Sequence, residues 1–262
     1  MQIQKRMSIG LISALSGFLI TVSGTGAQTY NPADWVNDPH QSNPNFVVFN
    51  ANSSSPVFSN NAVSLGTLYG NSPIGATLEL SNPGDTITFA GQVALSGELN
   101  PQGNMQFRVG LFLKGTNTDD INWLGYMIGN PTGEGAESGL YIRNNPNSGV
   151  YASGAPGSAM RPKCKTTAYA PGWTSGSYEF SLSVMQVSAE AQRVSWKLVG
   201  QAPSAYAFSG SYTNTFEPTL PRAFDQVGFL GGAALFSSAS SSPSINFTNL
   251  TVTFVPHKAG DQ

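Results

Sequence analysis

The stretch "MQFRVGLFLKG", residues 105–115, alternates between two kinds of side chain almost without interruption. One parity is wholly apolar: Met105, Phe107, Val109, Leu111 and Leu113. The other parity carries two cations, a glycine and a ring: Gln106, Arg108, Gly110, Phe112 and Lys114. Successive side chains of a β-strand point to opposite faces, so the pattern predicts a strand with one core face. The second face, polar yet partly aromatic, is the first candidate for a functional surface.

Short apolar runs separated by turn signals recur along most of the chain. They are "TLELSN", "TITFAGQVALSG", "INWLGYMIG", "GLYIR", "GSYEFSLSVMQVS", "RVSWKLVG", "AYAFSGSYT", "DQVGFLGG" and "SINFTNLTVTFVP". The turn Pro83-Gly84-Asp85 follows the first run, and "SAEAQ" reads as a tight hairpin connection. This spacing predicts an all-β sandwich or barrel. No stretch keeps the 3.6-residue apolar period of a helix, so we expect minimal helix.

The last run changes its buried face midway. Ile245 and Phe247 share one parity, whereas Leu250, Val252 and Phe254 share the other. A β-bulge produces such a change, because one extra residue shifts the alternation. We expect a bulged last strand that closes the sandwich by pairing near the first strand.

The N-terminus has the order of a secretory signal peptide. Lys5 and Arg6 precede an apolar run over residues 7–22, and "GTGAQ" then offers small residues before a cut after Ala27. The apolar run contains serines and is short for a membrane span of about 20 residues, so cleavage is favoured over anchoring. The chain then divides into a signal peptide (1–27), an Asn/Pro/Ser-rich segment (28–61), a β-sandwich (62–256) and a tail (257–262). The segment 28–61 holds one expected strand, Phe46–Phe49. We expect a secreted protein, extracellular or periplasmic, with no membrane attachment after cleavage.

Charge and cysteine content exclude several classes of protein. The formal net charge is −2, and loss of Lys5 and Arg6 with the signal makes it more negative. A mildly acidic chain with scattered cations lacks the basic patch of nucleic-acid-binding proteins. Charged residues are 10% of the chain, against about 25% in typical soluble domains, so uncharged polar residues must keep it soluble. Cys164 is the only cysteine; it cannot form a disulfide within one chain, and we expect it in a loop without a function. The sequence does not indicate an oligomeric state.

Several of these runs together resemble a known family. "GDTITFAGQVALSG", "FRVGLF", "WLGYMIG", "YEFSLSV", "RVSWKLVG", "FDQVGFLGG" and "FTNLTVTF" are similar to the concanavalin A-like jelly rolls, and most of all to the laminin-G-like domains of exported bacterial proteins. The resemblance covers about residues 62–256 and includes no catalytic signature. It implies an antiparallel two-sheet jelly-roll sandwich, with one convex, packed sheet and one concave, open sheet.

If the strand at residues 105–113 lies in the concave sheet, its second face lines a groove. Arg108 and Lys114 would then offer hydrogen-bond donors, Phe112 would offer a stacking face, and Gly110 would leave room for a ligand. For each of them the alternative is a solvated outer face or a packed ring.

The neighbouring runs add further candidates for the groove. In "INWLGYMIG", Trp123 and Tyr126 have opposite parities, so they are alternatives for the groove. In "GLYIR", Tyr141 and Arg143 share one parity. Trp196 lies between Val194 and Leu198, which favours the core.

The sequence offers little for catalysis. Glycoside hydrolysis needs two carboxylates about 5–9.5 Å apart, and the nearest pair, Glu134 and Glu137, lies in a Gly-rich loop. Serine-hydrolase triads and most zinc sites need histidine. His40 and His257 are the only histidines, and both fall outside the expected sandwich.

One loop has the donors of a calcium site. "NTDDIN" brings together four oxygen-bearing side chains: Asn117, Asp119, Asp120 and Asn122. Calcium takes six to eight oxygen ligands. The loop has no EF-hand pattern, so calcium is an alternative to having no cofactor at all.

The leading hypothesis is an exported, non-catalytic carbohydrate-binding jelly roll whose partner is a polysaccharide or other glycan. A structural or adhesive surface protein is the first alternative, since low charge and many Asn, Ser and Gly residues fit that role equally. A polysaccharide lyase that uses tyrosine and arginine is the second alternative, and it is favoured over a glycoside hydrolase.

Overall fold

The computed structural model describes residues 26–37, 47–49, 55–59, 68–99, 107–116, 123–129, 139–143, 160–164, 173–215, 221–231, 235–236 and 243–257. Every regular element in these ranges is a β-strand. The expectation of an all-β protein is therefore confirmed. Within the same ranges, no helix has the length and hydropathy needed to cross a membrane.

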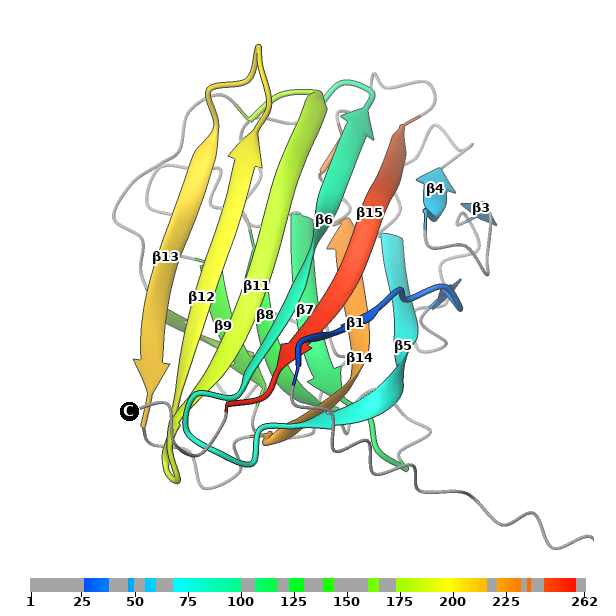
Figure 1. Ribbon diagram of the computed structural model, residues 1–262. Coiled ribbons are helices and arrows are strands. Elements are labelled where there is room, and N and C mark those ends of the chain that lie inside the picture. The colour runs from blue at the N-terminus through cyan, green and yellow to red at the C-terminus, as the bar shows by residue number, and fades with distance from the viewer. Residues whose placement is uncertain are drawn as a thin grey trace, which may run out of the picture.

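The strands form two antiparallel sheets that pack face to face (Figure 1). The eight-stranded sheet runs in the order β13 (Ala207–Asn214), β12 (Ala191–Gly200), β11 (Gly176–Ser188), β6 (Thr86–Ser96), β15 (Ser244–Val255), β4 (Val57–Ser59), β3 (Val47–Phe49), and β1 (Gln28–Tyr30) also pairs with β15. The seven-stranded sheet runs β10 (Met160–Cys164), β9 (Gly139–Arg143), β8 (Leu124–Gly129), β7 (Phe107–Leu113), β14 (Ala223–Gly231), β5 (Leu68–Glu79), β2 (Val36–Asn37).

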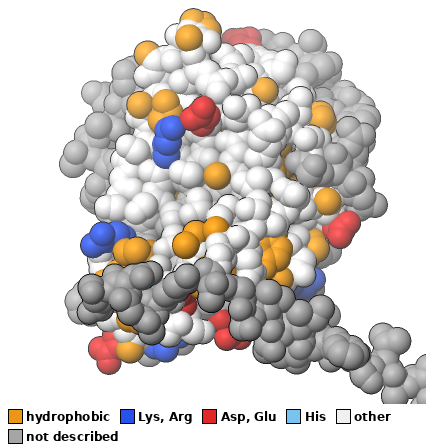
Figure 2. Space-filling model, in the orientation of Figure 1, with side chains coloured by type: hydrophobic (Ala, Val, Ile, Leu, Met, Phe, Trp, Pro, Cys, Tyr) orange, Lys and Arg blue, Asp and Glu red, His pale blue; other side chains and the backbone are white. Residues whose placement is uncertain are grey.

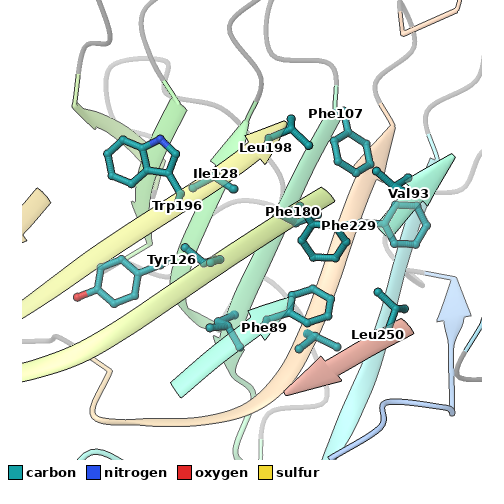
Figure 3. Packing of buried hydrophobic residues seen from close by; sticks show 14 of the residues in the cluster. Phe89, Val93, Phe107, Tyr126, Ile128, Phe180, Trp196, Leu198, Phe229 and Leu250 are labelled. Carbon is teal, nitrogen blue, oxygen red and sulfur yellow. The ribbon is translucent and has the colours of Figure 1, made fainter. Parts of the chain in front are cut away.

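The main core lies between the two sheets. On β7, the apolar parity that the sequence indicated is buried there, since Phe107, Val109 and Leu111 are at most 1% exposed. Figure 3 shows Phe89 and Phe180 of the eight-stranded sheet packed among side chains of the seven-stranded sheet. Trp196 is buried in the same cluster, as the sequence predicted.

The last strand carries the predicted bulge. The pairing of β15 with β6 shifts register between Thr248 and Thr251, and Asn249 has a left-handed φ of 55°. The buried parity changes across this point, so that four apolar side chains enter the core, Ile245 and Phe247 before the shift and Leu250 and Val252 after it. Pairing of β15 with β1 also brings the last strand next to the first, as expected.

The N-terminal segment contributes to both sheets and to the core. Strands β1 to β4 all fall within residues 28–61, and β3 includes most of the strand expected at Phe46–Phe49. Trp35 is completely buried, and its ring lies 5.7 Å from that of Phe229 and 6.1 Å from that of Phe247, centroid to centroid. This segment therefore folds together with the sandwich.

One sequence expectation is corrected: Cys164 is not a loop residue, because it ends β10, where it pairs with β9. His257 follows β15, and its backbone N–H donates to the buried carboxylate of Asp85 at 2.7 Å. The same carboxylate accepts the N–H of Asn82 at 2.7 Å, so the predicted turn also anchors the C-terminal segment.

Candidate functional site

Cross-strand register decides which predicted residues share a face. Gly110 on β7 pairs with Met127 on β8, which pairs with Tyr141 on β9. The same register places Arg108 and Phe112 on the side of the seven-stranded sheet that faces away from the main core. We call this side the outer face; by register, or by direct contact, it includes Arg108, Phe112, Lys114, Trp123, Tyr141 and Arg143. The structure describes the backbone of Arg143 and not its side chain.

The register also separates the two alternatives within "INWLGYMIG". Trp123 contacts Phe112 on the outer face, with ring centroids 6.2 Å apart. Tyr126 lies on the opposite side, in the main core, and its hydroxyl donates to Oε1 of Gln192 at 2.5 Å. Tyr126 is therefore not available to a ligand on the outer face, and the sequence-based candidate is corrected.

The outer face is closed at these positions. Arg108 is 8% exposed, Trp123 3%, Tyr141 1% and Phe112 0%. Together with Met127, the three rings form a second apolar layer that is separate from the main core cluster. The expectation of an open groove is wrong here, because a ring without exposed surface offers no stacking face to a ligand from solvent.

The glycines of this face make room for Phe112 and not for a ligand. A Cβ at Gly110 would overlap Cζ of Phe112. A Cβ at Gly125, on the adjacent strand, would lie 2.8 Å from Cδ1 of the same ring. The phenyl ring thus occupies space that a side chain at either glycine would need, which explains why the second parity of β7 combines a glycine with a phenylalanine.

Both cations of this parity lie over aromatic rings. The guanidinium carbon of Arg108 is 5.4 Å from the ring centroid of Tyr141, and Nζ of Lys114 is 5.7 Å from that of Trp123. Cations within about 6 Å of a ring centroid are attracted to its face. Arg108 accordingly covers the buried layer, whereas Lys114 is half-buried at its border.

An open hollow lies beside Lys114, where β5 bulges away from β14. Gln226 pairs with Pro73 and Phe224 pairs with Leu78, so Asp225 alone faces residues 74–77. Bulges of this kind re-aim side chains and are frequent next to binding sites. The hollow has a volume of about 350 Å³, and we call it the bulge pocket; it is lined by Pro73, Gly75, Ala76, Thr77, Lys114, Gly115, Asp225 and Gln226.

Asp225 organises one wall of the bulge pocket. Its Oδ1 accepts the backbone N–H of Lys114 at 2.6 Å, and its Oδ2 accepts that of Gly115 at 2.7 Å. A carboxylate has about four lone-pair sites, so each oxygen retains capacity for a further donor. The carboxylate therefore fixes the turn after β7 and still presents acceptors to the hollow.

Bare backbone forms the rim of the pocket. Gly75 and Gly115 have left-handed φ values of 91° and 57°, a conformation that glycine adopts most easily. A Cβ at either position would meet no atom within 4 Å, so both backbones border open space. Thr77 is exposed beside them. The pocket can thus accept a small, polar molecule close to the main chain.

The calcium candidates Asn117, Asp119, Asp120 and Asn122 lie outside the described residues. Among the residues that are described, no cluster of three or more His, Cys, Asp or Glu side chains is placed to hold a metal ion.

Sequence reasoning missed Asp225, Thr77 and the two glycines of the rim. A glycine within a strand pattern often marks a bulge, and Gly75 in "YGNSPIGATLEL" gave that signal. The position of Asp225 opposite the bulge gave none, because it depends on pairing between segments about 150 residues apart.

No protein-family model and no curated protein matches the chain. Solved structures do: arcelin-5, a lectin-like defense protein from Phaseolus vulgaris, aligns over 88% of this chain and 98% of its own, with 9% identity and a TM-score of 0.50. Lectin II from Ulex europaeus aligns over 87% of this chain and 97% of its own, with 11% identity and a TM-score of 0.46. At such identities the likeness to arcelin-5 shows the fold alone. Together with the sheet topology, it makes this chain a jelly-roll sandwich of the concanavalin A-like type.

Proposed function

We propose that the protein is an exported, non-catalytic carbohydrate-binding protein that holds one sugar residue in the bulge pocket. The observation that carries the proposal is the carboxylate of Asp225, fixed by two backbone N–H groups beside a hollow with a bare glycine rim. Arcelin-5 is described as lectin-like, so the fold is compatible with this function.

The lining of the pocket suits a ligand that is rich in hydroxyl groups. Hydroxyls that donate to a carboxylate make charge-assisted hydrogen bonds, which are stronger than neutral ones. Thr77 adds a hydroxyl to the lining. The volume of about 350 Å³ is near the lower end of ligand sites, which span about 300–1,000 Å³. One sugar ring therefore fits the pocket better than a long chain segment.

The pocket favours binding over catalysis. Asp225 is the single carboxylate among its lining residues, whereas glycoside hydrolysis uses a pair. The lyase alternative needs a tyrosine hydroxyl and a cation that both reach the substrate. Arg108 instead stacks on the ring of Tyr141, and both side chains are buried.

The structural or adhesive alternative keeps one observation in its favour. The outer face of the eight-stranded sheet, which Figure 2 shows, displays few charged side chains. A surface of this kind fits contact with other neutral surfaces, and it needs no small ligand. The test below separates this alternative from sugar binding.

The test is a glycan array with the chain from Gln28 onward, followed by calorimetry on each ligand that is found. Thr77 is exposed on the pocket rim, so Thr77→Trp should fill the hollow without loss of stability, and binding should weaken at least tenfold. The matched control is Thr213→Trp, at an exposed site on β13 in the other sheet, which should bind as the parent does. If a glycan binds and Thr77→Trp does not affect it, the site is elsewhere. If no glycan binds, the structural alternative takes precedence.

A further inference from the structure

The predicted cleavage point lies immediately before the first strand. Gly26 and Ala27 are exposed and precede β1, which begins at Gln28. A cut after Ala27 would leave Gln28 as the first residue of the chain and of the strand at the same time. The inference below rests on that cleavage and is independent of sugar binding.

The side chain of Gln28 is held by a residue that the fold fixes. The hydroxyl of Tyr30 donates to Oε1 of Gln28 at 2.6 Å. Tyr30 packs against the main core, and its backbone pairs with Val252 of β15. The donor is therefore attached to the folded sandwich and not to a loose terminus.

We propose that Gln28 is a modification site, which becomes pyroglutamate once the signal is removed. The freed α-amine attacks Cδ of its own side chain, so that a new N–Cδ bond closes a five-membered lactam. The Cδ–Nε2 bond breaks, and Nε2 leaves as ammonia with a proton from the attacking amine. The reaction needs no oxidant, reductant or other reactant.

Tyr30 acts as a positioning residue in this reaction. Attack at Cδ moves negative charge onto Oε1, the atom to which the Tyr30 hydroxyl already donates. A donor that is fixed where charge develops lowers the barrier of such additions. The lactam keeps this oxygen, so the same hydrogen bond remains in the product. The product also removes the positive charge of a free α-amine at the start of β1.

The site is tested first on protein from cells that export it. Intact mass and an N-terminal peptide map should give a chain that starts at residue 28 and lacks the mass of one ammonia. Gln28→Asn should keep a free amine, because its shorter side chain cannot close the five-membered ring. A different first residue, or Gln28 with its amide intact, would overturn the proposal.

The role of Tyr30 is tested by the rate of ring closure. A removable tag that leaves Gln28 at the terminus starts the reaction, and the loss of ammonia is followed by mass in buffer and in urea. The folded parent should react about tenfold faster than the unfolded chain, the effect of one good hydrogen bond to a developing charge.

In Tyr30→Phe, ring closure should be no faster in the folded chain than in the unfolded chain. The rate of ring closure in urea should equal that of the parent. The control Tyr212→Phe removes a hydroxyl from another half-buried tyrosine that packs against the core, and should react as the parent does. A parent that is no faster when folded, or a Tyr30→Phe variant as fast as the parent, would show that Tyr30 has no part in the reaction.

Discussion

The hydroxyl of Tyr126 on β8 donates to Oε1 of Gln192 on β12 at 2.5 Å, and so joins the two sheets through the buried core. Nε2 of Gln192 in turn donates to Oε1 of Gln186 at 3.0 Å and to the carbonyl oxygen of Pro221 at 2.9 Å. A buried polar network is stabilising when its members are satisfied, and costly when one partner is removed. This network gives Tyr126 a structural role in place of a binding role.

Tyr126→Phe should destabilise the protein by about 1–3 kcal/mol, because Oε1 of Gln192 would stay buried without its donor. Tyr206→Phe is the matched control. Tyr206 is equally buried, but its hydroxyl has no hydrogen-bond partner among the residues that the structure describes, and burial raises its pKa. Loss of that hydroxyl should leave stability unchanged or increase it. Urea unfolding compares the two variants; equal losses would contradict the assignment of the network.

The second apolar layer predicts a coupled pair on β7. Gly110→Ala should destabilise the protein, since the added methyl group meets the ring of Phe112. Phe112→Ala alone should cost about 3–5 kcal/mol as a buried phenylalanine. The double variant should cost clearly less than the sum of the two, because the alanine then enters space that the ring has left. Additive losses in urea unfolding would show that the ring does not lie on Gly110.

The alternation of apolar and polar residues along β7 and β15 was sufficient to predict the core face and the bulge. Every second side chain of a strand points to the same face, so residues of one parity are buried together. It did not show that the opposite parity was buried as well. Whether the side chain of Phe112 is exposed or buried depends on Gly125 of the adjacent strand, and on the register that pairs the two residues. Asp225 was missed for a similar reason, since its partner strand β5 is remote in sequence.

A surface pair offers a simple electrostatic test. Nζ of Lys197 on β12 lies 2.9 Å from Oε2 of Glu179 on β11, on the solvent-exposed side of the eight-stranded sheet. The hydrogen bond from Lys197, and then its charge, lower the pKa of Glu179 below its ordinary value. A carboxyl with a lowered folded-state pKa stabilises the fold above its unfolded pKa, and this effect is lost as the pH falls through the folded value.

Both side chains of this pair are about half exposed, so its effect on stability should be small. Titration followed by NMR is the sharper readout. Lys197→Ala should raise the pKa of Glu179 toward its ordinary value. A pKa of Glu179 that stays the same in this variant would mean that the pair does not persist in solution.

Asp225→Asn tests whether the carboxylate of Asp225 binds sugar in the bulge pocket. An amide retains one oxygen acceptor, but its Nδ2 would face a backbone N–H of Lys114 or Gly115, so the turn after β7 should lose about 1–3 kcal/mol. Sugar binding should weaken more than the small change in folded fraction explains, because a neutral amide accepts hydroxyl protons less strongly than a carboxylate. Binding is measured by calorimetry well below the melting temperature, on a ligand found with the parent.

The control is Asp85→Asn, which removes a carboxylate that also accepts two backbone N–H groups, at a turn that does not line the pocket. It should lose similar stability and keep full binding. Equal binding by Asp225→Asn and the parent would exclude the carboxylate from the sugar site.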